Sequence, residues 1–349
     1  MTRTTPTEQD QQTVSLQSWI IFIALAIVWG SSFILMKRGL LAYTPTQVGM
    51  LRITFAAAFI LGISFKKLKA LRRENFWPLL VVGIVSIVFP YLLFPLSVSK
   101  LDSGVVGILN SLVPLFTLII GVIWFQAKVS RIAVVGIVLG FLGAVWLLLP
   151  GLEIDSTKLI YGSFPIIAGV GYAIGVNTVN RYLRDLEPME VTVISLAFAV
   201  VPALVMIIAT DVVGAYRASE YGLSSLGYIA IMGVAGTALA NYFFNNLIKK
   251  TGSLFSSSVT YAIPVVALMW GFWDGEPVGV NEVLGMVLIL LGVWLVNSQN
   301  RSSKRAAAAI MDVEMAPEVG KGEEMASKDV EMAPEVGGSQ AGDSKVTSS

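Results

Sequence analysis

The 349-residue sequence contains no cysteine and no histidine, and only 13% of its residues are charged. Without cysteine the chain has no disulfide, no thiolate nucleophile and no cysteine-ligated metal. Without histidine it lacks the side chain that most often carries protons near neutral pH. Soluble domains have roughly 25% charged residues, so the shortage of charge, together with 55% hydrophobic residues, indicates a polytopic membrane protein.

Apolar runs of about 20 residues, long enough to cross roughly 30 Å of hydrocarbon, occur ten times in the sequence. Before the first run, residues 1–18 form a polar tail in which Arg3 is the only basic residue. This tail lacks the basic segment of a signal peptide, so we expect an uncleaved first helix. The runs span residues 19–36, 46–65, 76–98, 103–125, 130–149, 159–180, 190–210, 226–248, 253–273 and 280–297.

The second half of the sequence repeats the first with an offset of 150 residues. Because each copy has five apolar runs, the second copy must enter the membrane from the opposite side. We therefore predict an all-α membrane protein with ten transmembrane helices as two inverted five-helix repeats, residues 19–150 and 158–298, a layout typical of secondary transporters. The residues that recur are Gly83, Phe94, Lys100, Ser103, Pro114, Leu118 and Gly121, matched by Gly233, Phe244, Lys250, Ser253, Pro264, Leu268 and Gly271.

Lysine and arginine fall unequally on the two sides of the predicted helices. With the N-terminus inside, the short cytoplasmic segments hold fifteen of these residues and the external segments hold five. This bias predicts a multi-pass protein of the plasma (inner) membrane with both termini in the cytoplasm. The acidic tail, residues 301–349, repeats the segment DVEMAPEVG and is expected to be disordered. Such a duplication can bind a partner or can be a neutral expansion, and we favour the second interpretation.

Two sequence signatures resemble those of EamA-type transporters of the drug/metabolite transporter superfamily. The first is Trp29-Gly30-Ser31-Ser32-Phe33, followed by Lys37, Pro45 and Arg52. The second comprises Pro114, Gly121, Gln126, Gly136 and Gly143, and again Pro264, Gly271, Glu276, Gly285 and Gly292, with Gln126 in place of the usual glutamate. The resemblance covers residues 19–297 and implies a ten-helix, two-repeat metabolite transporter. It leaves the substrate open, because the superfamily includes amino-acid exporters, sugar-nucleotide carriers and drug exporters.

The prolines Pro114 and Pro264 are predicted to be paired hinges within equivalent helices. Each removes one backbone hydrogen bond and frees the carbonyl four residues earlier, at Asn110 and Thr260. Freed backbone groups at membrane depth are tolerated where they face protein or a water-filled cavity. We therefore expect the residues beside these hinges to line the substrate path. The alternative is a packed kink without a ligand. The expected lining residues are Asn110, Ser111, Thr260 and Tyr261.

Further polar side chains are expected to face the interior of the helix bundle. Asn241 and Asn245 lie one turn apart on one helix face, and Tyr91 matches Asn241 in the repeat. Amides avoid lipid, so these side chains either bind substrate or link helices. In the first and sixth helices, Trp29, Ser32 and Asn177 form a comparable set of candidate substrate-binding residues, although Trp29 could equally be core packing.

Arg52 is the one strong charge well inside a predicted helix. It could bind a carboxylate or extend to the headgroups, and the sequence interpretation favours the structural role. The glycines Gly169, Gly171 and Gly175 have the spacing of close helix packing. No acidic residue lies near the middle of a predicted helix, so we expect no buried proton site and a neutral or zwitterionic substrate.

The sequence as a whole predicts a secondary transporter that exports a small organic metabolite such as an amino acid. Rivals are a sugar-nucleotide or drug carrier of the same fold and a membrane scaffold acting through its tail. An enzyme is disfavoured because the chain has no histidine, cysteine or central carboxylate pair for catalysis. The expected partners are a small-molecule substrate and the lipid bilayer, with no nucleic acid, cofactor or metal. The sequence does not fix the oligomeric state and is compatible with a monomer.

Overall fold

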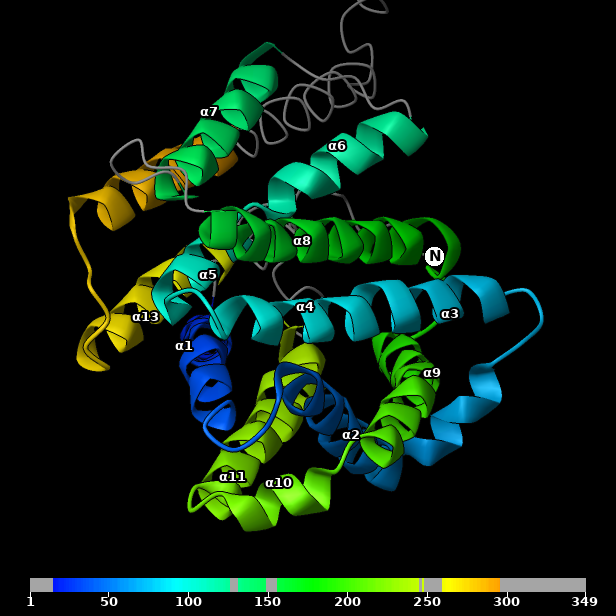
Figure 1. Cartoon of the computed structure of the whole chain (residues 1–349). Helices are drawn as coiled ribbons and strands as arrows, with labels where there is room; N and C mark the ends of the chain where they lie inside the picture. Colours follow the sequence, from blue (N-terminus) through cyan, green and yellow to red (C-terminus); the bar gives the residue numbers. More distant parts are fainter. Residues whose placement is uncertain (1–14, 126–130, 149–155, 245–246, 248–258, 296–349) are drawn as a thin grey trace, which may run out of the picture. The chain divides into compact units, whose positions relative to one another are not determined.

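The computed structural model describes residues 15–125, 131–148, 156–244, 247 and 259–295, and the secondary structure of these residues is helical throughout (Figure 1). We refer to residues 15–148 as the first half and to residues 156–295 as the second half. The first half contains α1 (Leu16–Gly39), α2 (Pro45–Ser64), the 3₁₀ helix η2 (Phe65–Ala70), α3 (Phe76–Gly83), the π-helix η3 (Ile84–Val88), α4 (Phe89–Val98), α5 (Ser103–Asn110), α6 (Val113–Phe125) and α7 (Arg131–Leu148). The second half contains α8 (Ser156–Tyr182), α9 (Pro188–Ala209), α10 (Val212–Ala218), α11 (Gly222–Gly233), the π-helix η5 (Val234–Leu239), α13 (Val259–Trp273) and a last helix over Val280–Leu295.

Seven helices in the described part of the chain are long and apolar enough to cross a membrane. Three shorter apolar helices lie where three further membrane helices are expected from the sequence. The prediction of an all-helical, multi-pass membrane protein is therefore confirmed. The seven helices span Leu16–Gly39, Pro45–Ala70, Phe76–Val98, Ser103–Trp124, Ser156–Val179, Pro188–Ala209 and Gly222–Phe244, and the shorter ones span Val134–Leu148, Ala262–Trp273 and Val280–Leu295.

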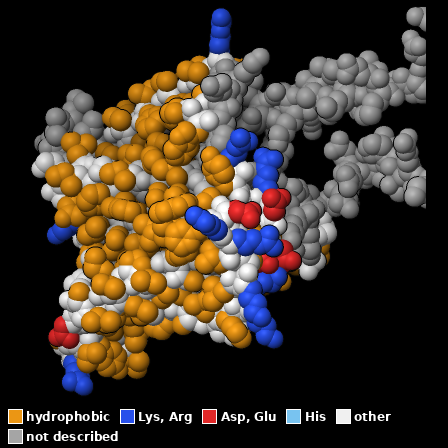
Figure 2. Space-filling view, turned by 90° about the vertical axis from the view of Figure 1, so that its right-hand side faces the viewer, with side chains coloured by type: hydrophobic (Ala, Val, Ile, Leu, Met, Phe, Trp, Pro, Cys, Tyr) orange, Lys and Arg blue, Asp and Glu red, His pale blue; other side chains and the backbone are white. Residues whose placement is uncertain are grey.

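Large apolar side chains cover much of the molecular surface, and charged side chains gather toward the margins of the face in Figure 2. On α7, for example, Val134, Val138 and Leu142 follow one another at intervals of one turn and are all exposed. Soluble monomers rarely expose apolar surface of this extent. These side chains therefore face the hydrocarbon of the bilayer.

Equivalent helices of the two halves begin with the same local chemistry. In α2, the Thr44 hydroxyl accepts from the Gln47 amide at 3.3 Å, and the Gln47 side chain accepts from the Thr44 amide at 3.0 Å. Glu187 and Glu190 form the corresponding capping box at the start of α9. Both helices have proline at their first position, where its fixed backbone angle favours helix and its missing N–H is not needed. The two helices pack against each other along their lengths.

The π-helices η3 and η5 occupy equivalent positions, because their first residues, Ile84 and Val234, are 150 residues apart. Each follows a glycine at which another helix approaches closely. A Cβ atom on Gly83 would lie 2.7 Å from the Ser195 carbonyl oxygen of α9, and one on Gly233 would lie 2.8 Å from the Arg52 carbonyl oxygen of α2. The contact of α3 with α9 and the contact of α11 with α2 are therefore of the same type, and each joins a helix of one half to a helix of the other.

The glycine pairs of the second sequence signature join α7 to the last helix. A Cβ atom on Gly292 would lie 2.5 Å from the Gly136 carbonyl oxygen, and one on Gly143 would lie 2.9 Å from the Ile289 amide nitrogen. Only glycine allows the two backbones to come this close. Beside this contact lies one of the main clusters of buried apolar side chains, which includes Leu112, Leu115, Ala144 and Ile289.

Candidate functional site

A group of polar and aromatic side chains from both halves meets well inside the helices. We call it the central cluster, and it consists of Trp29 and Ser32 of α1, Arg52 of α2, Tyr91 of α4 and Thr237 of η5. Each of these residues lies about two turns or more from the nearer end of its apolar helix, roughly 10 Å at 1.5 Å per residue. The cluster therefore lies at a depth where water is scarce and polar groups need partners.

Arg52 is the charged member of the central cluster, and its side chain is held inside the protein. The residue is only 8% exposed. Its Nε donates to the Thr237 hydroxyl at 3.1 Å, and its guanidinium carbon lies 4.3 Å from the centre of the Tyr91 ring. The guanidinium therefore points toward the second half, so the extension to the headgroups considered in the sequence analysis does not describe this side chain.

The π-helix η5 presents Thr237 to this arginine. The Thr237 hydroxyl accepts from Arg52 and from the Tyr91 hydroxyl, which lies 3.3 Å away, and it donates to the Met232 carbonyl at 3.2 Å. The Trp29 indole donates to the Gly236 carbonyl at 3.2 Å, so α1 is tied to the same segment. A π-helix shifts the hydrogen-bonding register and often marks a functional site.

Several donors of the central cluster remain open in the described part of the chain. Neither terminal nitrogen of Arg52 donates to a protein acceptor there. Asn241, one turn beyond Thr237, is half-buried and also has no hydrogen-bond partner among the described residues. This arrangement can bind a solute that supplies acceptors.

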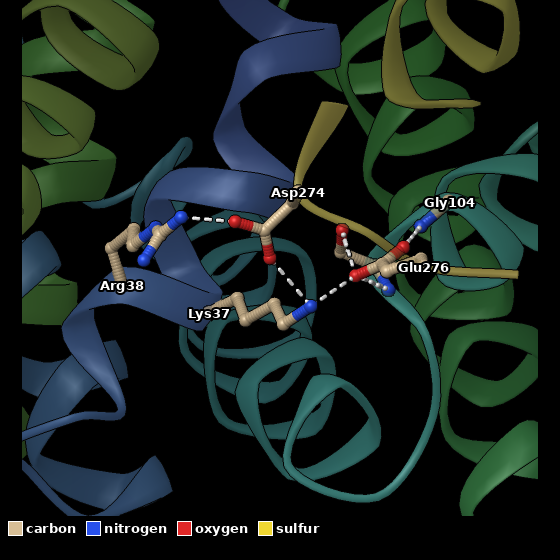
Figure 3. Close-up of polar contacts among 6 residues, drawn as sticks. Lys37, Arg38, Gly104, Asp274 and Glu276 are labelled. Atoms are coloured by element: carbon tan, nitrogen blue, oxygen red, sulfur yellow. Dashed lines mark hydrogen bonds and ion pairs between the residues drawn. The ribbon is translucent and has the colours of Figure 1, made fainter. Parts of the chain in front are cut away.

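A second constellation, which we call the Glu276 network, lies at the ends of α1 and α13 and the start of α5 (Figure 3). Glu276 accepts from Lys37 Nζ at 2.7 Å, from the Ser103 amide at 3.0 Å and hydroxyl at 2.8 Å, and from the Gly104 amide at 3.0 Å. Lys37 also contacts Asp274 at 2.6 Å, and Arg38 forms an ion pair with the same carboxylate. The network therefore joins two helices of the first half to the end of a helix of the second half.

The ionisation of Glu276 reflects these contacts. Burial of its carboxylate opposes ionisation, but the hydrogen bonds from Lys37 and from the Gly104 and Ser103 backbone outweigh burial and lower the pKa below its ordinary value. Nearby Asp102 behaves in the opposite way, because burial and the negative charge of Glu276 raise the pKa of its carboxyl. Glu276 is therefore the ionised acceptor that holds this end together.

The structure describes polar contacts at both ends of the helices. At the Glu276 end, the Tyr43 hydroxyl also donates to the Gly222 carbonyl at 3.1 Å, and the Ser225 hydroxyl donates to the Arg38 carbonyl at 2.8 Å. At the opposite end, Lys67 forms an exposed ion pair with Glu187 at 2.6 Å. There, an open groove of about 850 Å³ is lined by residues 62–75 and 182–190.

The remaining candidates from the sequence do not join the central cluster through any hydrogen bond that the structure describes. Asn177 donates to the Thr117 carbonyl at 3.1 Å, so it links α8 to α6. The Ser111 hydroxyl is buried and donates to the Ile108 carbonyl of its own helix, while Asn110 is half-buried and has no described partner. Thr260 and Tyr261 lie in α13, and the Tyr261 side chain, Asn245 and residues 301–349 lie outside the described residues.

The two candidate hinge prolines lie in different local structures. Before Pro114, the helix is interrupted at Ser111 and Leu112, and Pro114 is the second residue of α6. Pro264 lies inside α13, which continues past it without interruption. The expected break is therefore present in the first half, whereas in the second half the proline only removes a hydrogen bond. Hinge motion at either site stays a prediction.

Sequence reasoning did not single out Thr237 or the residues of the Glu276 network as functional. A signal for Glu276 was present, because it is the acidic residue of the second signature and Ser103 recurs as Ser253. Thr237 gave no comparable signal, since its sequence neighbours are alanine, glycine and leucine in an apolar run.

Comparisons with known proteins identify a family and several similar proteins. The model of the EamA-like transporter family matches the chain twice, over residues 17–149 and 160–298. An uncharacterized transporter of Archaeoglobus fulgidus is 25% identical over 80% of this chain and 99% of its own length. The uncharacterized transporter YyaM of Bacillus subtilis is 28% identical over 80% of this chain and 92% of its own.

An inner membrane transporter of Escherichia coli K12, the uncharacterized YedA, is 26% identical over 78% of this chain and 88% of its own. One solved crystal structure shares the fold, with a TM-score of 0.56 and 17% identity over 82% of this chain and 98% of the other. Because the family model accounts for most of the sequence in two matching stretches, the chain belongs to the EamA-like transporter family.

Proposed function

We propose that the protein is a secondary transporter that exports a small organic metabolite, such as an amino acid, by alternating access between two inverted five-helix repeats, residues 19–150 and 158–298. The double match to the family model supports the two repeats. So do the equivalent π-helices η3 and η5 and the matching approaches of Gly83 to α9 and of Gly233 to α2. Two opposed copies of one unit serve a carrier that must open to each side of the membrane in turn.

The central cluster is the observation that carries the proposal. It brings side chains of α1, α2 and α4 against η5, so it lies between the two halves, where secondary transporters bind their substrates. Its open hydrogen-bond donors are available to a solute. A purely structural polar cluster would be expected to pair its donors internally at this depth.

The two ends of the molecule support alternating access with one side closed. The excess of lysine and arginine in the predicted cytoplasmic segments assigns the open groove, with Lys66, Lys67 and Lys69 in its lining, to the cytoplasmic side. The Glu276 network then closes the external side. In the proposed export cycle, solute enters from the cytoplasmic side while the Glu276 network closes the external side.

A sugar-nucleotide carrier of the same fold is the second candidate considered, and the central cluster disfavours it. A diphosphate group needs several cationic or amide donors around it. Arg52 is the only cation of the central cluster. A small metabolite with a single charge matches this site better.

Reconstitution tests the proposed function directly. Purified protein is reconstituted into liposomes that are loaded, in separate batches, with unlabelled amino acids, an unlabelled sugar nucleotide or an unlabelled cationic dye, and the uptake of the corresponding labelled solute is followed by counterflow. We expect amino-acid exchange above the rate of protein-free liposomes. The amino-acid assignment is wrong if no amino acid exchanges, the transport function is wrong if no solute exchanges at all, and exchange of the sugar nucleotide alone would establish the second candidate.

A further inference from the structure

We infer that Arg52 binds a carboxylate of the transported solute through its two terminal nitrogens. The inference rests on the proposed transport function and narrows it, since it requires a carboxylate on the solute and disfavours neutral amides, cations and phosphate compounds. It concerns the part of the central cluster where α2 faces η5.

The first argument is the unbalanced charge of Arg52. In the described part of the chain, no carboxylate lies within ion-pair distance of its guanidinium, whereas Lys37, Arg38 and Lys67 all have acidic partners. An ionisable side chain inside a membrane protein is costly and usually pairs with an opposite charge or serves a substrate path. The Tyr91 ring and the Thr237 hydroxyl offset part of this cost, but neither carries a negative charge.

The second argument is the way in which the guanidinium is held. Its Nε is fixed by Thr237 and its face rests on the Tyr91 ring, so the two constraints leave the terminal edge free. That edge carries the two parallel N–H groups that match the spacing of a carboxylate. A lysine could not present this fork, because its ammonium is a single point of charge.

The third argument is that residue 236, which lies beside this edge, carries no side chain. A Cβ atom on Gly236 would lie 3.7 Å from Nη2 of Arg52 and 3.2 Å from the Ser32 hydroxyl. Because residue 236 is a glycine, no side chain of η5 occupies this position. An acceptor group placed beside the fork would also be near the Ser32 hydroxyl and the Trp29 indole, both of which border Gly236.

The single cation decides between a carboxylate and a phosphate. A carboxylate carries one charge and is matched by one guanidinium, whereas a phosphate ester carries up to two and is usually held by several donors. The neighbours of Arg52 in the central cluster are a hydroxyl, a phenol and an indole, all neutral. The same positive charge repels a cationic drug.

Matched pairs of acid and amide test the inference. Binding to the purified protein is measured from the shift in thermal unfolding with L-leucine, L-phenylalanine, L-threonine and pyruvate, and with the amide of each. We expect at least one acid to stabilise the protein and its amide to bind about 10- to 100-fold more weakly, the range for loss of a charge-assisted contact. The inference is overturned if acids and amides behave alike across the panel.

Variants then assign the effect to the guanidinium. Arg52→Gln should weaken acid binding by about 10- to 100-fold and leave the binding of pyruvamide, the uncharged amide of the panel, unchanged. Arg52→Lys should give an intermediate loss, because it keeps the charge and loses the fork. Arg217→Gln, which removes an exposed arginine of α10, is the matched control and should bind as the parent does. If Arg52→Gln does not fold, Thr237→Val removes the hydroxyl that accepts from Arg52 Nε and from Tyr91 and should weaken the acid several-fold, while Arg52 keeps its charge.

Transport separates this inference from the proposed function. If liposomes exchange only solutes without a carboxylate, the transport function stands and the role of Arg52 is refuted. If acids bind in an Arg52-dependent way but no solute crosses the bilayer, the carboxylate subsite stands and the transport function is refuted. An unchanged acid affinity in folded Arg52→Gln protein overturns the inference whatever the transport result.

Discussion

Replacement of Glu276 by glutamine should open the end of the molecule that the Glu276 network holds closed. The carboxylate accepts three hydrogen bonds from the start of α5 and one from Lys37 of α1. Glutamine keeps one acceptor oxygen and places an amino group at the position of the other. One of the α5 amides then faces a donor, and Lys37 loses a negative partner.

The free energy by which the closed conformation is weakened follows from these lost contacts. A hydrogen bond to a charged group contributes about 1.5 to 3 kcal/mol, and a buried donor left unpaired costs about 1 to 3 kcal/mol. Lys37 is about a third exposed, so solvent screens its share. We therefore expect the closed conformation to lose about 2 to 3 kcal/mol relative to the open one, which shifts their ratio about 30- to 150-fold.

Cysteine labelling measures this shift without interference, because the chain has no cysteine of its own. Val106 is 0% exposed and lies one turn from Ser103 within α5, behind the network. In a Val106→Cys background, a membrane-impermeant maleimide added on the Lys37 side should label the Glu276→Gln protein faster by the same factor. Glu282→Gln is the matched control, since Glu282 accepts only from the Gly279 amide of its own turn, at 2.7 Å. Unchanged labelling in Glu276→Gln, or equal labelling in both variants, would refute the reasoning.

Three further predictions concern pH, packing and the hinge. Because the pKa of Glu276 is lowered from 4.5, its contribution to closure is complete above that value and is lost as pH falls through its folded pKa. The labelling rate of Val106→Cys, divided by that of a free thiol at the same pH because maleimide reacts with the thiolate, should therefore stay constant from neutral pH down to 4.5 and rise only below it. Gly292→Leu should lower the unfolding temperature through a loss of about 1 to 3 kcal/mol, because its Cβ would meet backbone at 2.5 Å, whereas Gly227→Leu, with nothing within 4 Å, should not. Pro114→Ala should restore a backbone N–H donor where the helix is interrupted between α5 and α6. We expect it to change the transport rate and the side of the membrane from which the protein is labelled. If the rate and the labelled side both equal those of the parent protein, this proline only packs.

The positions of the helices were predictable because membrane helices follow directly from the length of apolar runs. The close pairing of α7 with the last helix was not predicted, because Gly136, Gly143, Gly285 and Gly292 entered only as part of a family signature and their spacing does not say which helices they join. The π-helices were not predictable. The residues of η5 have ordinary helical composition, so the shift of register that turns Thr237 toward Arg52 depends on contacts across the protein.

Helical periodicity also explains which candidate residues came together and which did not. It assigns a side chain to a face of its helix but not to a neighbour. Trp29 and Asn177 were therefore grouped, yet Trp29 contacts η5 and Asn177 contacts α6. Lys37 and Glu276 are 239 residues apart in sequence, and only the fold brings them together.

The first turn of α5 is capped by a residue from the other half of the chain. Asp102 occupies the N-cap position but makes no capping hydrogen bond, and the acceptor for the first amides is Glu276 from the other half of the chain. When the two halves separate at this end, the first turn of α5 loses these acceptors and frays. Backbone amide exchange at Ser103 and Gly104 therefore reports the opening of the molecule, with slow exchange in the closed conformation and fast exchange in the open one.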